Sequence, residues 1–195
     1  IAALSASDIA TMSAAQVALL SADQVAAIKT TILATFSTDQ MAGFQNSQIA
    51  AFTTAQAAAL KSSQIGALTG SQIAAFETAD FAKISSAGIK GLTATQITSV
   101  TADQIAAMST AMVANLAVDV VSALSDTQVA ALTATQVGVL TTAHIAGLSV
   151  AQLNALDAAD FSSLKTTQIA VLSADQVGGL SNTQIAALTT AQAAR

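Results

Sequence analysis

A repeat of eight residues dominates this sequence and limits what it can fold into. From Leu4 onward every eighth residue is apolar, and residues 4–195 divide into 24 octads without insertion or deletion. The consensus octad is L-[ST]-x-x-Q-[IV]-A-A, whose positions we number one to eight. Position two is Ser or Thr in 17 octads, and position five is Gln in 16 and Asp in three. Because the phase never breaks, we expect residues 1–195 to form a single continuous array, without a linker or domain boundary.

The period of eight is incompatible with one long helix or with a simple strand. Eight helical residues advance by roughly 800°, so an apolar stripe would drift by about 80° per octad and circle the helix. In a strand, positions one and six would point to opposite faces. Neither arrangement keeps both apolar positions buried.

A chain of very short helices satisfies every position of the octad. Ser or Thr followed three residues later by Gln is a capping box, and the flanking apolar residues at positions one and six form the hydrophobic staple. A helix of about six residues is unstable alone and has to bury its apolar side chains against neighbouring octads. We therefore predict an all-α fold, an α-solenoid or superhelix of about 24 very short helices, one per octad. The predicted capping pairs include Thr101 with Gln104, Ser125 with Gln128, Thr133 with Gln136, and Ser173 with Gln176.

Two octads lack both the cap and the glutamine. One carries Lys29 and Ile32 at these positions, and the other carries Ala117 and Val120. With no cap to start a new helix, we expect longer continuous helices near 22–36 and 110–124. These irregular octads are possible contact sites for another chain; the simpler alternative is that long helices tolerate the lost caps.

A third irregular octad contains Gly88, Lys90 and Gly91. Two glycines lower the helix propensity, so we expect this unit to be loose and count it among the possible contact sites. The array also begins in the middle of an octad, and it lacks the polar capping repeats that solenoids need. This predicts a segment of a longer array.

The residues available for chemistry are few. The chain has no Cys, one His and 6 Lys or Arg among its 195 residues. These counts argue against thiol chemistry, His-rich metal sites and nucleic-acid binding. His144 occupies a glutamine position, and Asp157 and Asp160 occupy positions two and five, where capping explains them better than a paired-carboxylate site. We expect no catalytic residue, cofactor, metal site or small-molecule substrate, and no transmembrane segment, because no apolar run approaches about 18 residues.

Two resemblances arise from the octad. The stretch Leu132–Val137, LTATQV, resembles the opening of a transcription activator-like effector repeat. That family has a much longer repeat with Pro and basic charge, and their absence here argues against DNA binding. Tandem L-[ST]-x-x-Q-[IV]-A-A arrays also resemble repeat regions of large secreted bacterial proteins of the adhesin-like and hemolysin types. This second resemblance implies a structural role outside the cell or at its surface.

The expected function is therefore non-catalytic. The leading hypothesis is a structural repeat protein, either a solenoid spacer or a subunit of an extracellular filament or surface assembly. Its partners would be other copies or neighbouring repeats, because so few charges give little repulsion between copies. The alternatives are an adhesive solenoid that binds a peptide, glycan or protein partner, and an ice-binding repeat protein with regular Ser and Thr rows.

Overall fold

The computed structural model describes residues 5–193, and this part of the chain is entirely helical. It contains 23 α-helices of four to six residues and one short 3-10 helix, η1, with no strand. The elements follow one another at the spacing of the octad, so each octad contributes one of them. The predicted all-α, solenoid-like repeat architecture is confirmed.

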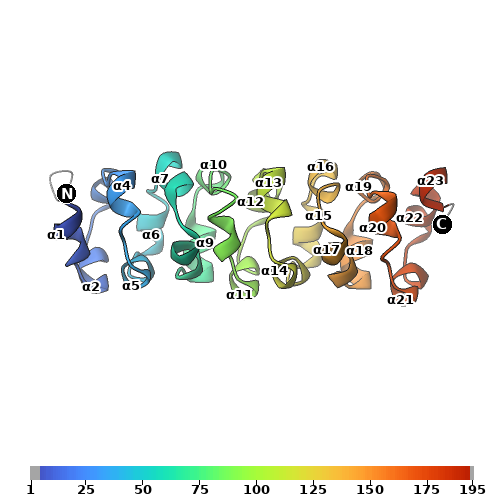
Figure 1. Ribbon diagram of the computed structural model, residues 1–195, viewed down its shortest axis with the longest axis horizontal. Coiled ribbons are helices and arrows are strands. Elements are labelled where there is room, and N and C mark those ends of the chain that lie inside the picture. The colour runs from blue at the N-terminus through green and yellow to red at the C-terminus, as the bar shows by residue number, and fades with distance from the viewer. Residues whose placement is uncertain (1–4, 194–195) are drawn as a thin grey trace. The chain divides into compact units, whose positions relative to one another are not determined.

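The chain forms two compact units, Ile1–Val100 and Thr101–Arg195. The division falls in the chain between Val100, at octad position one, and Thr101, at position two. The helices of the first unit (Figure 1) are α1 Ala6–Ala10, α2 Ala14–Val17, α3 Ala22–Ala26, α4 Thr30–Leu33, α5 Thr38–Ala42, α6 Asn46–Ile49, α7 Thr54–Ala59, α8 Ser62–Gly66, α9 Gly70–Ala75, α10 Thr78–Phe81, η1 Ile89–Gly91 and α11 Ala94–Ile97. Those of the second unit are α12 Ala102–Ala107, α13 Thr110–Ala114, α14 Val118–Ser122, α15 Asp126–Ala130, α16 Ala134–Val137, α17 Thr142–Gly147, α18 Val150–Ala155, α19 Ala158–Ser162, α20 Thr166–Ile169, α21 Ala174–Gly178, α22 Asn182–Ala187 and α23 Thr190–Ala193. The prediction of one continuous array stays a prediction from the sequence.

Most octads fold into a short helix because a side chain caps the first turn and a hydrogen bond between residues three apart closes the last turn. In a typical octad, Thr133 is extended, with φ −83° and ψ 158°, and its hydroxyl accepts a hydrogen bond from the Gln136 N–H. At the other end of the helix, the Leu140 N–H donates to the Val137 carbonyl three residues earlier, at 3.2 Å. The chain then becomes extended at the next position two, where Thr141 starts another helix. The break between helices is thus built into the octad.

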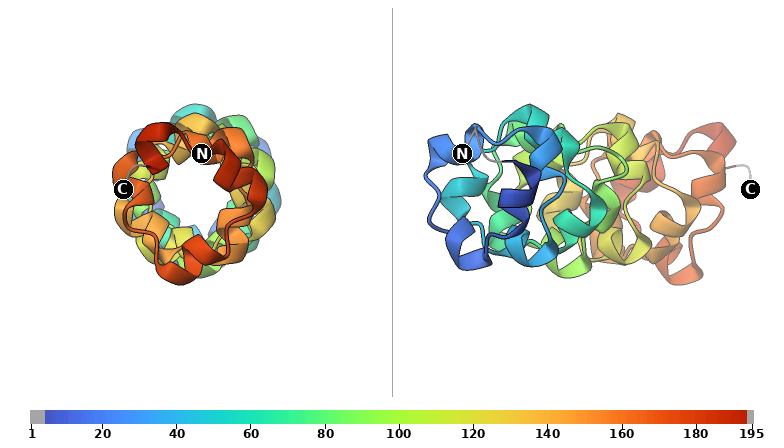
Figure 2. Two further views of the ribbon diagram at one scale, coloured as in Figure 1. Left: turned by 90° about the vertical axis from the view of Figure 1, so that its right-hand side faces the viewer. Right: turned by 60° about the vertical axis from the view of Figure 1, so that its left-hand side comes forward.

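Within each unit the helices pack in successive turns of a coil. In the first unit α2 contacts α5, and α5 contacts α8; in the second unit α14 contacts α17, and α17 contacts α20. Neighbours across turns are therefore three helices apart in sequence. The side chain of Gln40 in α5 also reaches the carbonyl groups of Ile9 and Met12 at the end of α1, four helices earlier. These contacts give one turn of the coil between three and four octads. Figure 2 shows the winding of the helices.

The core lies on the inner side of the coil and consists of positions one and six. Through most of both units these side chains are buried, whereas positions three and four are mainly exposed. In the first unit four position-one phenylalanines touch one another: Phe36 stacks on Phe44, Phe44 meets Phe52 edge to face, and Phe52 meets Phe76 in the same way, with ring centroids 5.2 to 5.7 Å apart. Such contacts between residues up to 24 positions apart show that position one fills the interior of this unit.

The predicted continuous helices near 22–36 and 110–124 are wrong. The first region is split into α3 and α4, and Lys29, the residue directly before α4, is extended with ψ 141°. The second region is split into α13 and α14 at Ala117, where ψ is 154°. Neither Lys29 nor Ala117 makes a side-chain cap, so the octad period persists even where the local capping signal is lost.

A side chain from the following turn holds each of these breaks open. In a continuous helix, the carbonyl group of Ile28 would accept from the Ile32 N–H. Instead, Ile32 donates to the Lys29 carbonyl at 2.9 Å, and the Ile28 carbonyl accepts from the Gln56 side chain at 2.8 Å. At the second break, the Leu116 carbonyl lies 3.0 Å from Nε2 of His144. Packing and hydrogen bonds between turns therefore outweigh a lost cap, which costs only about 1 kcal/mol.

Restoring the cap at the first break should stabilise the protein. Lys29→Ser places a hydroxyl where it can accept from the Ile32 N–H, as Ser109 accepts from Met112 at 3.2 Å in an octad that also lacks glutamine. We expect a gain of about 1 kcal/mol in the free energy of unfolding, measured by urea denaturation. Lys29→Ala is the matched control and should give much less. Equal effects of the two substitutions would show that position 29 gains nothing from a cap.

Candidate functional site: the inter-turn glutamines

The glutamine at position five makes two kinds of hydrogen bond at once. Oε1 of Gln136 accepts from the backbone N–H of Thr133 at 2.8 Å, which completes the capping box of α16. Its Nε2 group donates to the carbonyl groups of Ile105 at 2.9 Å and Met108 at 2.7 Å, at the end of α12 in the preceding turn. One carboxamide therefore caps its own helix and ties it to a helix 28 to 31 residues earlier.

The same tie recurs through both units. We call the glutamines that make it the inter-turn glutamines. In the first unit they are Gln40, Gln48, Gln56, Gln64, Gln72 and Gln96. In the second unit they are Gln136, Gln152, Gln168, Gln176, Gln184 and Gln192. All are buried, and the bonds satisfy polar groups whose burial would otherwise be costly.

A capping function alone does not explain why position five is glutamine. The capping box accepts Glu as readily as Gln at this position. In this sequence position five holds Gln in 16 octads and never holds Glu. A carboxylate could accept from the cap but could not donate to the carbonyl groups of the preceding turn. This bias against Glu was the available signal for the inter-turn tie, which capping arguments missed.

The four predicted capping pairs all form reciprocal bonds. Thr101 with Gln104, Ser125 with Gln128, Thr133 with Gln136, and Ser173 with Gln176 each place the hydroxyl 3.1 to 3.4 Å from the glutamine N–H and the glutamine Oε1 2.8 to 3.0 Å from the cap N–H. The side chains of Gln136 and Gln176 also donate to carbonyl groups of the preceding turn, for example those of Met108 and Leu148, a second bond that the capping hypothesis did not include.

His144 replaces glutamine at position five and makes both the cap bond and one inter-turn bond. Its Nδ1 accepts from the backbone N–H of Thr141 at 3.2 Å, and its Nε2 lies 3.0 Å from the carbonyl oxygen of Leu116. These contacts fit the neutral ring with the proton on Nε2. The side chain is only 2% exposed, and this burial lowers the pKa of His144, although the bond to Leu116 opposes the effect.

This arrangement predicts an acid-sensitive step in stability. Because the folded pKa of His144 lies below the unfolded value, its contribution to stability is complete above the unfolded pKa and is lost as the pH falls toward the folded pKa. The free energy of unfolding should therefore fall as the pH drops below about 6.5, the ordinary pKa of histidine. Urea denaturation of the protein and of His144→Gln over this range checks this, because glutamine keeps both bonds without titrating. The charged residues on the helices packed against α17 are Asp119 in α14 and Lys165 at the start of α20, and both are present in the two proteins compared. Parallel pH profiles of the two proteins would contradict a contribution of His144 to the pH dependence of stability.

Two acidic pairs replace the usual Ser or Thr and Gln. Asp157 caps α19 by accepting from the Asp160 N–H at 2.7 Å, and Glu77 stands in the same position relative to Asp80 at α10. Burial raises the pKa of Asp80, as does the nearby Glu77. Burial and the charge of Asp157 likewise raise the pKa of Asp160. In both octads position six is a fully buried Phe. The Asp at position five is shorter than the usual Gln, and the Phe at position six is larger than the usual Ile or Val.

The octad with Gly88, Lys90 and Gly91 is irregular but not loose, which corrects the expectation from its glycines. It forms the 3-10 helix η1 in place of an α-helix and packs directly on α8. A Cβ atom at Gly88 would lie 2.6 Å from the Leu60 carbonyl oxygen, and one at Gly91 would lie 1.8 Å from that of Ser62. Where glutamine is missing, glycine lets the backbone itself approach the preceding turn. Only Lys90 of these three residues is exposed.

The other predicted contact sites differ in their accessibility. Lys29 and Ala117 are exposed, Ile32 is half-buried, and Val120 is buried with 1% exposure. Val120 is therefore a core residue, and the suggestion that it contacts another chain is wrong. Its apolar side chain stands at the position that glutamine occupies in most octads.

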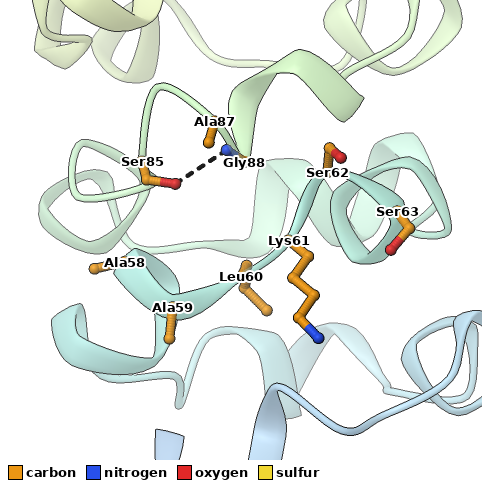
Figure 3. Close-up of a pocket in the computed structure, with 9 residues that line it drawn as sticks. All are labelled: Ala58, Ala59, Leu60, Lys61, Ser62, Ser63, Ser85, Ala87 and Gly88. Atoms are coloured by element: carbon orange, nitrogen blue, oxygen red, sulfur yellow. Dashed lines mark hydrogen bonds between the residues drawn. The ribbon is translucent and has the colours of Figure 1, made fainter. Parts of the chain in front are cut away.

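A shallow pocket of about 490 Å³ lies beside η1 (Figure 3). Its lining combines small side chains with backbone: Ala58, Ala59, Leu60, Lys61, Ser62, Ser63, Ser85, Ala87 and Gly88. Ser85 Oγ accepts from the Gly88 N–H at 3.0 Å, and the Lys61 ammonium donates to the Ala34 carbonyl at 2.7 Å. The polar groups named here are thus already engaged within the first unit.

Neither a metal-ligand cluster nor a membrane-spanning helix is present in residues 5–193. No group of three or more His, Cys, Asp or Glu side chains comes together in this part of the chain. No helix in the same residues has the length and apolar character needed to cross a membrane.

Comparison with known proteins identifies the repeat. A comparison with curated proteins found no match. The family model of the ALTTAQ repeat matches residues 33–70, 73–110 and 154–190, together more than half of the chain. Its hexapeptide stands unaltered at residues 187–192, where it covers the end of one octad and the capping box of α23. This chain therefore belongs to the ALTTAQ repeat family.

Proposed function

We propose that this chain is a non-catalytic structural repeat protein, which serves as a spacer or as a subunit of an extracellular or cell-surface assembly. The family supports the coarser part of this statement, a structural repeat protein. The location and the assembly are our inference from the resemblance to secreted bacterial repeat proteins and from the low charge of the chain, 9% of its residues.

The inter-turn glutamines are the observation that carries the proposal. Polar side chains that an active site would use are here committed to holding turns together. His144 bonds to Thr141 and Leu116, and Asp157 bonds to the backbone of Asp160. These bonds are local to one helix or join it to the preceding turn. Such an arrangement favours a mechanical role over chemistry.

Ties between turns also suit a spacer. Helices of four to six residues have little stability of their own, so each depends on its neighbours in the preceding and following turns. Stability then accumulates with each added octad, as in other solenoids. Length can change in steps of eight residues without altering the contacts of the rest.

The proposed location can be tested on the cells that make the protein. Antibodies raised against the purified chain should label intact cells or the surrounding medium, and protease added to intact cells should remove the signal. Matched samples permeabilised before labelling serve as the control for total protein. Labelling that requires permeabilisation would contradict an extracellular role.

A further inference from the structure

Two octads carry a carboxyl group where an inter-turn glutamine would stand. Asp80 in α10 and Asp160 in α19 occupy position five, and each is followed by a buried Phe. Three residues before each of them, an acid replaces the usual Ser or Thr cap. Asp80 is only 7% exposed. Within residues 5–193 neither of the two carboxyl groups makes a hydrogen bond, so both helices lack the side-chain tie to the preceding turn.

The acceptors for these two ties are present and unused. Throughout both units, a glutamine at position five donates to the position-one carbonyl group 28 residues earlier. The equivalent carbonyl groups are those of Phe52 for Asp80 and of Leu132 for Asp160. In the part of the chain that the structure describes, neither carbonyl group accepts a hydrogen bond. Each of these turns therefore combines a carboxyl group without a bond and a carbonyl group without a donor.

The residue at the cap position decides how readily a position-five carboxyl group holds a proton. Asp8, the third Asp at position five, follows Ser5, whose hydroxyl and backbone N–H donate to it at 2.7 and 2.8 Å. These bonds lower the pKa of Asp8. Glu77 offers no hydroxyl to Asp80; burial and the charge of Glu77 raise the pKa of Asp80 instead. An acid at position two thus favours a proton at position five.

We propose that Asp80 and Asp160 are proton-dependent inter-turn ties, which are open at neutral pH and closed in mild acid. A proton taken from solvent by the carboxylate of Asp80 becomes a donor to the Phe52 carbonyl group. A proton on Asp160 becomes a donor to the carbonyl group of Leu132 in the same way. Because Asp is one methylene shorter than Gln, each tie draws its helix closer to the preceding turn.

Within each unit, the helices packed against α10 and α19 carry no charged side chain. In the first unit α10 packs against α7, and in the second α19 packs against α16 and α22. The residues of these three helices are all uncharged. Lys61 follows α7, but its ammonium group is bonded to the Ala34 carbonyl at 2.7 Å, and Lys83, after α10, is exposed. The acids at the cap positions are therefore the charges that act on Asp80 and Asp160.

The direction of this response is opposite to that of His144. Because the folded pKa of Asp80 lies above the unfolded value, its contribution to stability is complete below the unfolded pKa and is lost as the pH rises through the folded pKa. The contribution of His144 is instead lost in acid. Acid therefore closes the ties of α10 and α19 and weakens the tie of α17.

Urea denaturation at pH values from 7 to about 4 tests the proposal, in a His144→Gln background that removes the opposite response. Asp80→Asn supplies a permanent Nδ2 donor with nearly the shape of the protonated acid. At neutral pH it should raise the equilibrium constant for folding by about tenfold, and at about pH 4 the two proteins should agree within about threefold. Asp160→Asn should behave likewise in the second unit. Asp39→Asn is the matched control, because Asp39 is exposed at position four, and its effect should stay below about threefold at every pH.

Replacing the cap acid separates a new donor from relief of charge repulsion. Glu77→Thr restores the usual cap, whose hydroxyl can donate to Asp80 as that of Ser5 donates to Asp8. The stabilisation by acid should then move to lower pH, and Asp80→Asn should still stabilise the protein at neutral pH. If the gain from Asp80→Asn vanished in the Glu77→Thr background, repulsion alone would explain it, and the proposed tie would be wrong.

Two further results would overturn the proposal. One is an Asp80→Asn variant that is no more stable than its parent at neutral pH, and the other is a gain that stays constant as the pH falls. Neither result bears on the location of the protein or on a spacer role, which the cell-labelling experiment tests separately. Failure of this inference and failure of the proposed function are therefore distinguishable.

Discussion

Replacing Gln136 with Glu should lower the free energy of unfolding by about 3 kcal/mol at neutral pH. The substitution keeps the oxygen that accepts from Thr133, so the cap survives. It removes the Nε2 donor and leaves a carboxylate facing the carbonyl oxygens of Ile105 and Met108, at a side chain only 2% exposed. Lost bonds to two buried acceptors, together with burial of a charge, account for a loss of this size. Urea denaturation followed by circular dichroism measures it.

Gln16→Glu is the matched control for this prediction. Gln16 caps α2 through the same oxygen, at 2.8 Å from the Ser13 N–H, but it is exposed and bonds to no preceding turn within the described residues. The free energy of unfolding of the Gln16→Glu variant should differ from that of the unaltered protein by less than about 0.5 kcal/mol. If both substitutions cost the same, glutamine would be acting as a cap alone, and the inter-turn tie would contribute nothing.

Gly91→Ala should destabilise the first unit by about 3 kcal/mol. A Cβ atom at residue 91 would lie 1.8 Å from the carbonyl oxygen of Ser62 and 2.5 Å from its carbonyl carbon. Both atoms belong to the backbone of α8, so no flexible side chain can move aside, and η1 has to withdraw from the preceding turn. Overpacking of this kind costs roughly 1 to 3 kcal/mol and sometimes more. Thermal denaturation measures the effect.

Gly178→Ala tests whether the loss comes from the close approach. Gly178 ends α21, and a Cβ atom there would meet nothing within 4 Å. Because alanine favours helix, this variant should gain about 0.5 to 1 kcal/mol. A comparable loss in both variants would mean that the effect is not specific to the contact with Ser62.

Much of the local structure could be predicted from the sequence because the octad encodes it locally. The capping pair Thr133 and Gln136 and the apolar residues on either side of it are within six residues of one another. Caps and staples act at this range, so the number, length and class of the helices followed from the pattern. The inward position of Leu132 and Val137 also followed, because short helices have to bury both residues.

What the sequence did not reveal depends on contacts between turns. The break at Lys29 is held by Gln56, which is 28 residues from the carbonyl group of Ile28 that it binds. Local capping rules contain no information about that partner, and they therefore predicted a continuous helix. Gly88 is a similar case, since its low helix propensity was visible but its approach to Leu60 in the preceding turn was not.

Exchange of the glutamine side-chain amide protons is the most direct test of the inter-turn tie. In ¹⁵N NMR, the Nε2 protons of Gln136 and Gln168 should exchange with solvent as slowly as backbone amides in the same turns, because they are buried and bonded to the preceding turn. Those of Gln16 and Gln24, which have no such tie within residues 5–193, should exchange at the rate of free glutamine. Fast exchange at all four residues would contradict the claim that glutamine joins successive turns.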